Sequence, residues 1–261
     1  MKALHLPPHK ISDLIILEGI KGIKAIKEVS RVQGHIAGGM GVQSYLPSEA
    51  YRASVDLDFS LLWAGGTADF KAITIPLVDH FKSSGYEISF KKKGLTYEYT
   101  LIDPKSEDSL LIQHQRRSNN HFEKSKKQAL EREVANQRVI TKGDLSYAVM
   151  SPEDLAVHKI SRVIKFAERF GVALPHKTDI VSLRASSDSI RADVVSRLDN
   201  ATPEEIARLR LFYDCFDIKC LATYAGLNNG YFREVVKEWS DSPKEVFNYL
   251  HLLGKLEVSL D

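Results

Sequence analysis

The sequence predicts an α/β protein with a mixed sheet, flanking helices and a helical C-terminal part. Two observations predict this class. Between residues 36 and 150, short apolar segments with strand-like alternation are separated by turn residues and by amphipathic segments. From residue 151 onward, every segment has helical periodicity. We therefore expect an α/β domain over residues 1–150 and a helical domain over residues 151–261.

The order of elements in the first domain follows from periodicity and turn residues. An amphipathic pattern predicts the first helix, which Gly34 ends, and Pro76 is expected to kink a later helix. The predicted helices cover residues 11–33, 40–50 and 68–84, and a charged helix or a loop follows over 122–137. The first predicted strand begins at Ile36. The other predicted strands cover residues 54–63, 86–90, 96–102, 109–115, 139–140 and 147–150.

Three helix starts share the same chemistry in the second domain. Each has Ser or Thr at the N-cap and Pro at the first helical position, followed by acidic residues in the first turn. They are Ser151-Pro152-Glu153-Asp154, Thr202-Pro203-Glu204-Glu205 and Ser242-Pro243-Lys244-Glu245. These starts predict at least three helices after residue 150.

The composition is that of an ordinary globular protein. The chain has 261 residues, of which 43% are hydrophobic and 27% charged, and a net charge of +2. Cys215 and Cys220 are poorly aligned for a disulfide on one helix, so we expect reduced, buried thiols and a cytoplasmic protein. No apolar run approaches the roughly 18 residues of a membrane span. The N-terminus lacks the apolar core of a signal peptide, so no membrane association is expected.

A glycine turn followed by two aspartates is the strongest chemical signal. Asp56 and Asp58 alternate with apolar residues, so they share one face of a strand. Neighbouring carboxylates repel each other, and a cation that prefers oxygen ligands, Mg²⁺ or Mn²⁺, relieves this repulsion. Gly38 and Gly39 leave the backbone open to a phosphate. Alone, Gly-Gly is usually a turn and Asp-x-Asp a solvated strand end, but in this order they predict a site for a metal-bound nucleoside triphosphate (NTP).

This arrangement resembles the DNA polymerase β-like nucleotidyltransferase superfamily, and in detail the branch of AbiEii/AbiGii-type toxins. The branch pattern is Gly-Gly, a spacer, then Arg-x-Thr/Ser-x-Asp-x-Asp. It is met by Gly38, Gly39, Arg52, Ser54, Asp56 and Asp58. The resemblance implies a magnesium-dependent transfer of a nucleoside monophosphate, with the two aspartates as catalytic metal ligands and the other four residues at the nucleotide. It also implies a cytoplasmic bacterial toxin that acts with an antitoxin partner.

A second part of the branch pattern lies after Ser151-Pro152-Glu153-Asp154. Lys159 occupies the place of a lysine that the resemblance assigns to the triphosphate, and Arg162 lies on the same helical face. The alternative is that both are solvated helix charges. The branch then has Asp-x-x-Asp-Leu, of which residues 179–183 keep the first acid, Asp179, but have Ser182 in place of the second.

The third carboxylate of the superfamily is missing from its expected strand. Residues 109–115 contain no acid, and Gln113, His114 and Gln115 occupy the region. Glutamine cannot accept a proton as a base would. A neutral His114 is one candidate base, Asp103 is a weaker candidate expected in a turn, and a third possibility is that the two aspartates and the triphosphate suffice.

The positive charge is concentrated in one segment. Residues 116–143 contain eight Lys or Arg and three Glu, a local net charge of +5. This suits an RNA acceptor such as tRNA, and it equally suits a charged surface helix. Two other functions stay open: a non-catalytic nucleotide- or RNA-binding module on the same fold, and an antibiotic-modifying transferase.

Overall fold

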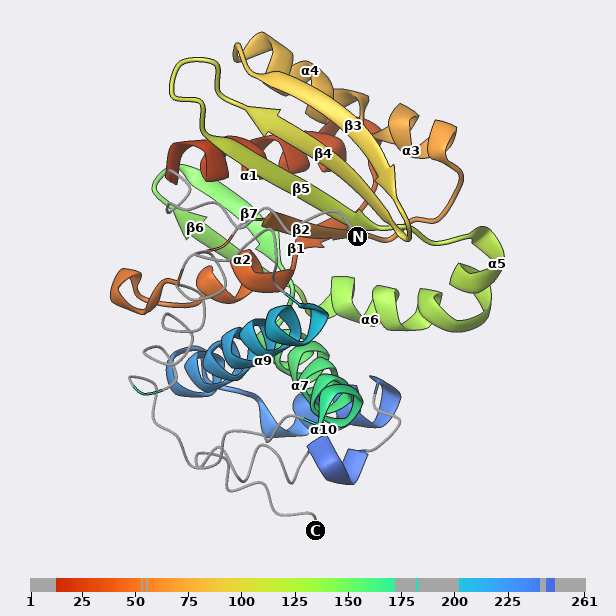
Figure 1. Cartoon of the computed structure of the whole chain (residues 1–261). Coiled ribbons are helices and arrows are strands. Elements are labelled where there is room, and N and C mark those ends of the chain that lie inside the picture. The colour runs from red at the N-terminus through yellow and green to blue at the C-terminus, as the bar shows by residue number, and fades with distance from the viewer. Residues whose placement is uncertain are drawn as a thin grey trace. The chain divides into compact units, whose positions relative to one another are not determined.

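The computed structural model describes residues 13–52, 54, 56–171, 182, 202–239 and 243–246 (Figure 1). Two compact units are formed. Among the described residues, the α/β unit comprises 13–44, 52, 54 and 56–151, and the helical unit comprises 45–51, 152–171, 182, 202–239 and 243–246. Among the described residues, no helix is both long and apolar enough to cross a membrane.

A mixed seven-stranded sheet forms the α/β unit, in the order β3-β4-β5-β2-β1-β7-β6. The pairs β2–β5 and β1–β7 are parallel, and the other neighbours are antiparallel. The strands are β1 (Gly34–Ile36), β2 (Asp56–Leu61), β3 (Glu87–Lys93), β4 (Thr96–Ile102), β5 (Ser109–Gln115), β6 (Arg138–Lys142) and β7 (Leu145–Val149). The predicted fold class, a mixed sheet with flanking helices, is confirmed.

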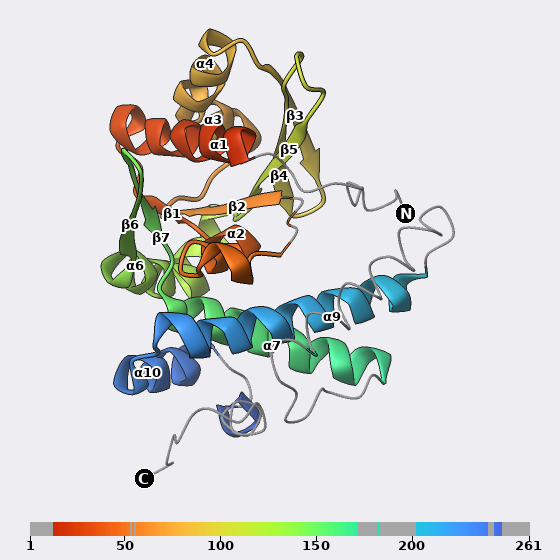
Figure 2. The ribbon, with the colours of Figure 1, turned by 90° about the vertical axis from the view of Figure 1, so that its left-hand side faces the viewer.

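One face of this sheet carries the apolar core and is covered by α1 (Asp13–Ala25), α3 (Thr67–Ile73) and α4 (Ile75–Ser83) (Figure 2). Helix α1 lies so close to the sheet that a Cβ on Gly19 would stand 2.7 Å from a methyl of Leu110. Phe70 of α3 stacks on Tyr97 of β4 with ring centroids 4.2 Å apart. Polar residues of the strands are therefore directed to the other face, where the candidate site lies.

Two predicted helices of the α/β unit are interrupted. The segment 68–84 is not one kinked helix but two, because Pro76 lies in the first turn of α4, where its missing N–H costs nothing. Thr74 stands between them and bonds through its hydroxyl to the carbonyl of Phe70 at 2.7 Å and to the Tyr99 hydroxyl at 2.6 Å. The segment 11–33 leaves α-geometry after Ala25, passes through η1 (Ile26–Ser30) and ends at Arg31, whose φ is +60°.

Other element boundaries also differ from the prediction. The segment 40–50 forms α2 (Gly38–Gln43) and a single 3₁₀ turn, η2 (Ser48–Ala50). Strand β3 continues to Lys93 because its lysines pair with β4. After β5 the chain is helical through α5 (Asn119–His121), η3 (Phe122–Lys126) and α6 (Lys127–Asn136), so the basic segment is helix rather than loop.

After Ser151 the described residues include α7 (Pro152–Phe170), α9 (Pro203–Cys220), η5 (Leu221–Ala225) and α10 (Asn229–Trp239), and residues 243–246 are also helical. The predicted cap at Thr202 is confirmed as a capping box, in which the Thr202 hydroxyl accepts from the Glu205 N–H and the Glu205 carboxylate accepts from the Thr202 N–H. Cys215 and Cys220 are buried and form no disulfide. Ser242 lies outside the described residues.

The acids of the first turn of α7 link helices rather than face solvent. The Glu153 carboxylate accepts from the backbone N–H of Asn228 at 2.7 Å. The Asp154 carboxylate accepts from the Tyr231 hydroxyl, also at 2.7 Å. Both acids are buried. These bonds fix the start of α10 against the start of α7.

Candidate functional site

The two aspartates of β2 lie on the face of the sheet opposite the apolar core. Between and after them, Leu57 and Phe59 are buried on the core side, 0% and 3% exposed. Successive side chains of a strand point to opposite faces, so Asp56 and Asp58 share the other face. The alternation predicted for this strand is what the structure shows.

The glycine turn lies directly against the second aspartate. Gly38 has φ +62°, and a Cβ built on it would stand 2.0 Å from Oδ2 of Asp58. The Ala37 N–H donates to the Asp58 carbonyl at 2.9 Å, which holds the turn to the strand. No residue with a side chain fits at position 38 without moving the carboxylate, so both the backbone conformation and the contact require glycine.

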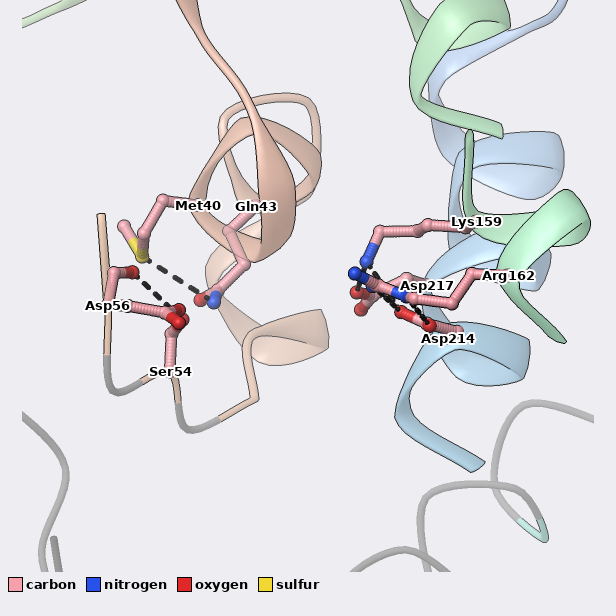
Figure 3. A network of polar contacts seen from close by, with 8 residues as sticks. All are labelled: Met40, Gln43, Ser54, Asp56, Lys159, Arg162, Asp214 and Asp217. Atoms are coloured by element: carbon pink, nitrogen blue, oxygen red, sulfur yellow. Dashed lines mark hydrogen bonds and ion pairs between the residues drawn. The ribbon is translucent and has the colours of Figure 1, made fainter. Parts of the chain in front are cut away.

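Arg52 and Ser54 meet the second glycine. A Cβ on Gly39 would lie 2.9 Å from Nη2 of Arg52 and 3.2 Å from Oγ of Ser54. The Ser54 hydroxyl donates to the Asp56 carbonyl at 3.2 Å (Figure 3). The six residues that carry the family resemblance therefore gather at one end of β2. They combine two carboxylates, one guanidinium, one hydroxyl and a glycine backbone without side chains.

A neutral amide and then a third carboxylate continue the aspartate row across the sheet. Gln113 of β5 is the register partner of Asp58, and Glu98 of β4 is the register partner of Gln113. The Gln113 amide nitrogen donates to the Glu98 carboxylate at 2.7 Å. Glu98 is 5% exposed and lies 3.6 Å from the Lys93 ammonium. Sequence analysis missed Glu98 because only the strand register brings it into this row.

His114 is not available as a base at this site, and that hypothesis was wrong. It is the register partner of Phe59 on the core face, and its ring stacks on Phe70 with centroids 5.4 Å apart. It is 1% exposed, and burial, reinforced by the nearby Arg117 guanidinium, lowers its pKa to about 3. The neighbouring glutamines are turned to the opposite face, as strand alternation requires.

Asp103 lies in a turn, as expected, and does not supply the third acid. Its carboxylate accepts from the Lys105 N–H at 2.9 Å and from the Ser106 hydroxyl at 3.0 Å. Among the residues that the structure describes, no group of three or more His, Cys, Asp or Glu is arranged to hold a metal ion. Asp56 and Asp58 fit a magnesium ion as two oxygen donors, because Mg²⁺ commonly takes only one or two carboxylates and completes its shell with phosphate and water.

The helical unit contains a separate cluster of charges between α7 and α9. The Lys159 ammonium lies 2.9 Å from Asp214 and 2.7 Å from Asp217, and all three side chains are buried (Figure 3). The Arg162 guanidinium donates to both oxygens of Asp214. Burial alone would raise the pKa of Asp214, but Arg162 and Lys159 hold it well below its ordinary value.

This cluster changes the interpretation of the second motif. Lys159 and Arg162 are not simply solvated helix charges, because each has a carboxylate partner. Their contact with a triphosphate stays a prediction. Asp179 lies outside the described residues, whereas Asp214 and Asp217 have the Asp-x-x-Asp spacing that we assigned to residues 179–183. Ile218 follows them where the pattern has leucine, a signal present in the sequence.

The basic segment is less positive at its surface than its composition suggests. Arg117 is 8% exposed and donates to the Ser60 hydroxyl and the Leu61 carbonyl. Burial lowers the pKa of Arg117, and the charge of Glu133 opposes this shift. The exposed cations of the segment are Lys124, Lys127 and Arg138.

Comparison with known proteins gives distant structural similarity only. No family model matches the chain, and no curated protein matches it. An antigenic nucleotidyltransferase-like protein from Paracoccidioides brasiliensis is 15% identical, with 73% of this chain and 94% of that chain covered and a TM-score of 0.42. The antibiotic-resistance factor ANT(2'')-Ia is 11% identical, with 80% and 90% covered and a TM-score of 0.38. The cyclic AMP-GMP synthase DncV from Vibrio cholerae is 10% identical, with 82% and 55% covered and a TM-score of 0.29.

Proposed function

We propose that this protein is a magnesium-dependent nucleotidyltransferase that moves a nucleoside monophosphate from an NTP to an acceptor. One observation carries the proposal. Gly38 approaches Asp58 so closely that a Cβ would stand 2.0 Å from its carboxylate, while Asp56 shares the same strand face. A carboxylate pair that suits a metal ion beside backbone without side chains, which a phosphate can approach, supports the proposal.

Each side chain of the site has a distinct role in this proposal. Asp56 and Asp58 hold the metal, which neutralises phosphate charge when bound. The backbone at Gly38 and Gly39 admits the phosphates, and the Arg52 guanidinium binds them in the planar geometry that suits phosphate oxygens. Ser54 fixes the strand entry through its bond to the Asp56 carbonyl. Catalysis is then mainly positioning and charge stabilisation of an in-line displacement.

Lys159 and Arg162 belong to the proposal as groups that stabilise charge on the leaving pyrophosphate. Arg162 is the more accessible of the two, because its side chain is 48% exposed while that of Lys159 is 4% exposed. Asp214 fixes the orientation of both cations through its ion pairs. The position of the lysine within this buried cluster supports a preorganised charge rather than a mobile one.

The acceptor in this proposal is an RNA such as tRNA. The exposed cations Lys124, Lys127 and Arg138 support it, because a basic surface attracts the phosphate backbone. The family resemblance adds a toxin-like role in the cytoplasm of a bacterium, with an antitoxin protein as partner.

A binding module without catalysis is the second candidate, and Gln113 favours it. This residue stands where a third carboxylate would act as metal ligand or base, and an amide accepts no proton. A protein with this site would bind the metal and the NTP without turning the nucleotide over.

Transfer of label from NTP separates the two candidates. The full chain is incubated with each α-labelled NTP, Mg²⁺ and total RNA, and the label on RNA and on protein is measured. We expect label on RNA that disappears in Asp56→Asn and Asp58→Asn and is retained in Glu87→Gln, an exposed acid on the edge strand. Magnesium-dependent NTP binding without any transfer would instead establish the binding module.

A further inference from the structure

We propose that Gln113 supplies the third protein oxygen of the metal site, and that Glu98 is the positioning residue that turns the Gln113 amide toward Asp58. This inference rests on the proposed function, because it concerns the metal that Asp56 and Asp58 are proposed to hold. It assigns a role to a buried carboxylate that the nucleotide site does not otherwise use.

Strand pairing places the three side chains in one row. Gln113 is the register partner of Asp58 on one side and of Glu98 on the other. Register partners project from the same face of a sheet, and adjacent strands are about 4.8 Å apart. Gln113 therefore stands between two carboxylates on the face that also carries Asp56.

The hydrogen bond to Glu98 determines which way the amide faces. An ionised carboxylate can only accept, so the Gln113 amide must present its nitrogen to Glu98, at 2.7 Å. The same carboxylate oxygen lies 3.6 Å from the Lys93 ammonium. Because the oxygen and nitrogen of an amide point in different directions from the carbonyl carbon, the Gln113 oxygen is turned away from Glu98 when the nitrogen bonds to it. Asp58 is the register partner on that side.

An amide oxygen in this position is a suitable ligand. Hard divalent cations accept Asn and Gln carbonyls together with carboxylates. Glu98 is 5% exposed, and its carboxylate is held by the Gln113 amide and the Lys93 ammonium. Carboxylates that orient a ligand in this way typically contribute about 10- to 100-fold to metal affinity. Position 113 carries no negative charge, but Glu98 on the adjacent strand β4 provides a carboxylate in the same row.

Manganese affinity tests the proposal without measuring turnover. Mn²⁺ binding to the full chain, with a non-hydrolysable NTP analogue present, is measured by electron paramagnetic resonance and calorimetry. Glu98→Gln should weaken Mn²⁺ binding about tenfold or more, since glutamine no longer fixes the amide. Gln113→Leu, which removes the oxygen, should weaken it similarly. Glu87→Gln makes the same charge change at an exposed position of β3 and should leave the affinity unchanged.

An exchange of the two residues gives the sharper result. In the double variant Gln113→Glu/Glu98→Gln, the carboxylate is at position 113, next to Asp58, and the amide is at position 98, one strand further away. Mn²⁺ affinity should recover to at least the wild-type value, which a purely structural role for Glu98 does not predict. Wild-type affinity in both Glu98→Gln and Gln113→Leu would overturn the inference, even if Glu98→Gln lowered the melting temperature.

The two levels of proposal fail differently. If Asp58→Asn abolishes Mn²⁺ binding while Glu98→Gln and Gln113→Leu retain it, the inference is overturned and the nucleotidyltransferase site stands. If the wild-type chain binds no Mn²⁺ with the analogue present, both are overturned. Should Glu98→Gln fail to fold, Gln113→Leu and the double variant decide the question.

Discussion

Position 38 leaves the least room for a side chain among the described glycines. We expect Gly38→Ala to lose magnesium-dependent NTP binding, because a methyl group would displace the Asp58 carboxylate. The left-handed backbone adds a cost of about 1 kcal/mol for a residue with a Cβ. Calorimetric NTP titration and urea denaturation measure the two effects separately.

Gly94 offers a matched control for that prediction. Its φ is +58°, close to that of Gly38, but a Cβ built there meets nothing within 4 Å. Gly94→Ala should show a similar loss of stability and normal NTP binding. Equal NTP binding by Gly38→Ala and Gly94→Ala would show that the close approach of Gly38 to Asp58 is not needed for NTP binding.

The pKa of His114 predicts a pH dependence of stability and not of catalysis. Because burial lowers this pKa to about 3 from an ordinary value near 6.5, the unfolded chain takes up the proton first as pH falls. The stability contributed by neutral His114 is complete above about pH 6.5 and is lost between there and about pH 3. The slope is about 1.4 kcal/mol per pH unit. Urea denaturation at several pH values should show this slope reduced in His114→Phe, which keeps the stacked ring.

The outcome for activity is equally specific. His114→Phe should leave the pH dependence of nucleotide transfer unchanged between pH 5 and pH 8. An inflection near pH 6.5 that disappears in His114→Phe would return the histidine to the mechanism.

Sequence reasoning at this scale succeeded where neighbours in the chain are neighbours in space. Asp56, Asp58 and Arg52 lie within one short stretch, and strand alternation alone places the two aspartates on one face. Glu98 could not be found in this way, because its relation to Asp58 passes through the register of two strand pairs. Asp214 was missed because its partner Lys159 lies 55 positions earlier.

The helix pair α7–α9 depends on a buried ion pair. Asp214→Asn should destabilise the protein by about 1.5–3 kcal/mol, because it removes a carboxylate that pairs with Arg162 and one of the two carboxylates beside the buried Lys159. The pKa of Asp214 is lowered in the folded state, so its stabilising effect is complete above its ordinary pKa and is lost as pH falls through the folded value. The difference between wild type and variant should therefore be full at pH 7 and shrink below about pH 4.

Urea denaturation at pH 7 and pH 3 checks this result. Asp144→Asn is the control, since Asp144 is an exposed acid in the turn before β7. A difference between wild type and Asp214→Asn that is small at pH 7, or that grows on acidification, would contradict the assigned pairing.

The segment η3–α6 carries the prediction about RNA. Lys124→Gln/Lys127→Gln should weaken RNA binding and reduce the dependence of log K on log salt by roughly 1.4, the value for two phosphate contacts to a single strand. Fluorescence anisotropy with tRNA at several salt concentrations measures both quantities. Lys82→Gln/Lys105→Gln removes two other exposed charges and should change neither. If the two double variants weakened RNA binding equally, the binding would depend only on the net charge of the protein and not on the segment η3–α6.

Elements were predicted well where capping or pairing is local. The strands 96–102 and 109–115 have the predicted boundaries, because clear turn residues separate them. The helices were predicted less well where backbone geometry changes without a strong breaker. The π turn after Ala25 has no distinct sequence signal, and Pro76 was interpreted as a kink when it begins a new helix.

At the scale of the whole molecule, composition and periodicity were enough for the fold class but not for the assignment of every segment. Residues Tyr45–Tyr51 group with the helical unit although they lie between α2 and β2 of the α/β unit. The sequence predicted most of these residues as the end of a helix over 40–50, whereas the structure has there only a single 3₁₀ turn after Pro47. Tertiary packing decides which unit such a connection joins, and a single sequence does not encode that choice in a local pattern.

The excursion at Tyr45–Tyr51 bears on the order in which the chain acquires its structure during translation. During translation the glycine turn is synthesised first, followed by this connection and then by the strand that carries the aspartates. The helices with which the connection groups are synthesised only after β7. N-terminal parts generally fold first as they emerge. The sheet is therefore complete before the connection between Gly38 and Asp58 gains its packing partners, so in a nascent chain that ends at Val149 the two halves of the proposed metal site are joined by a loop without those partners.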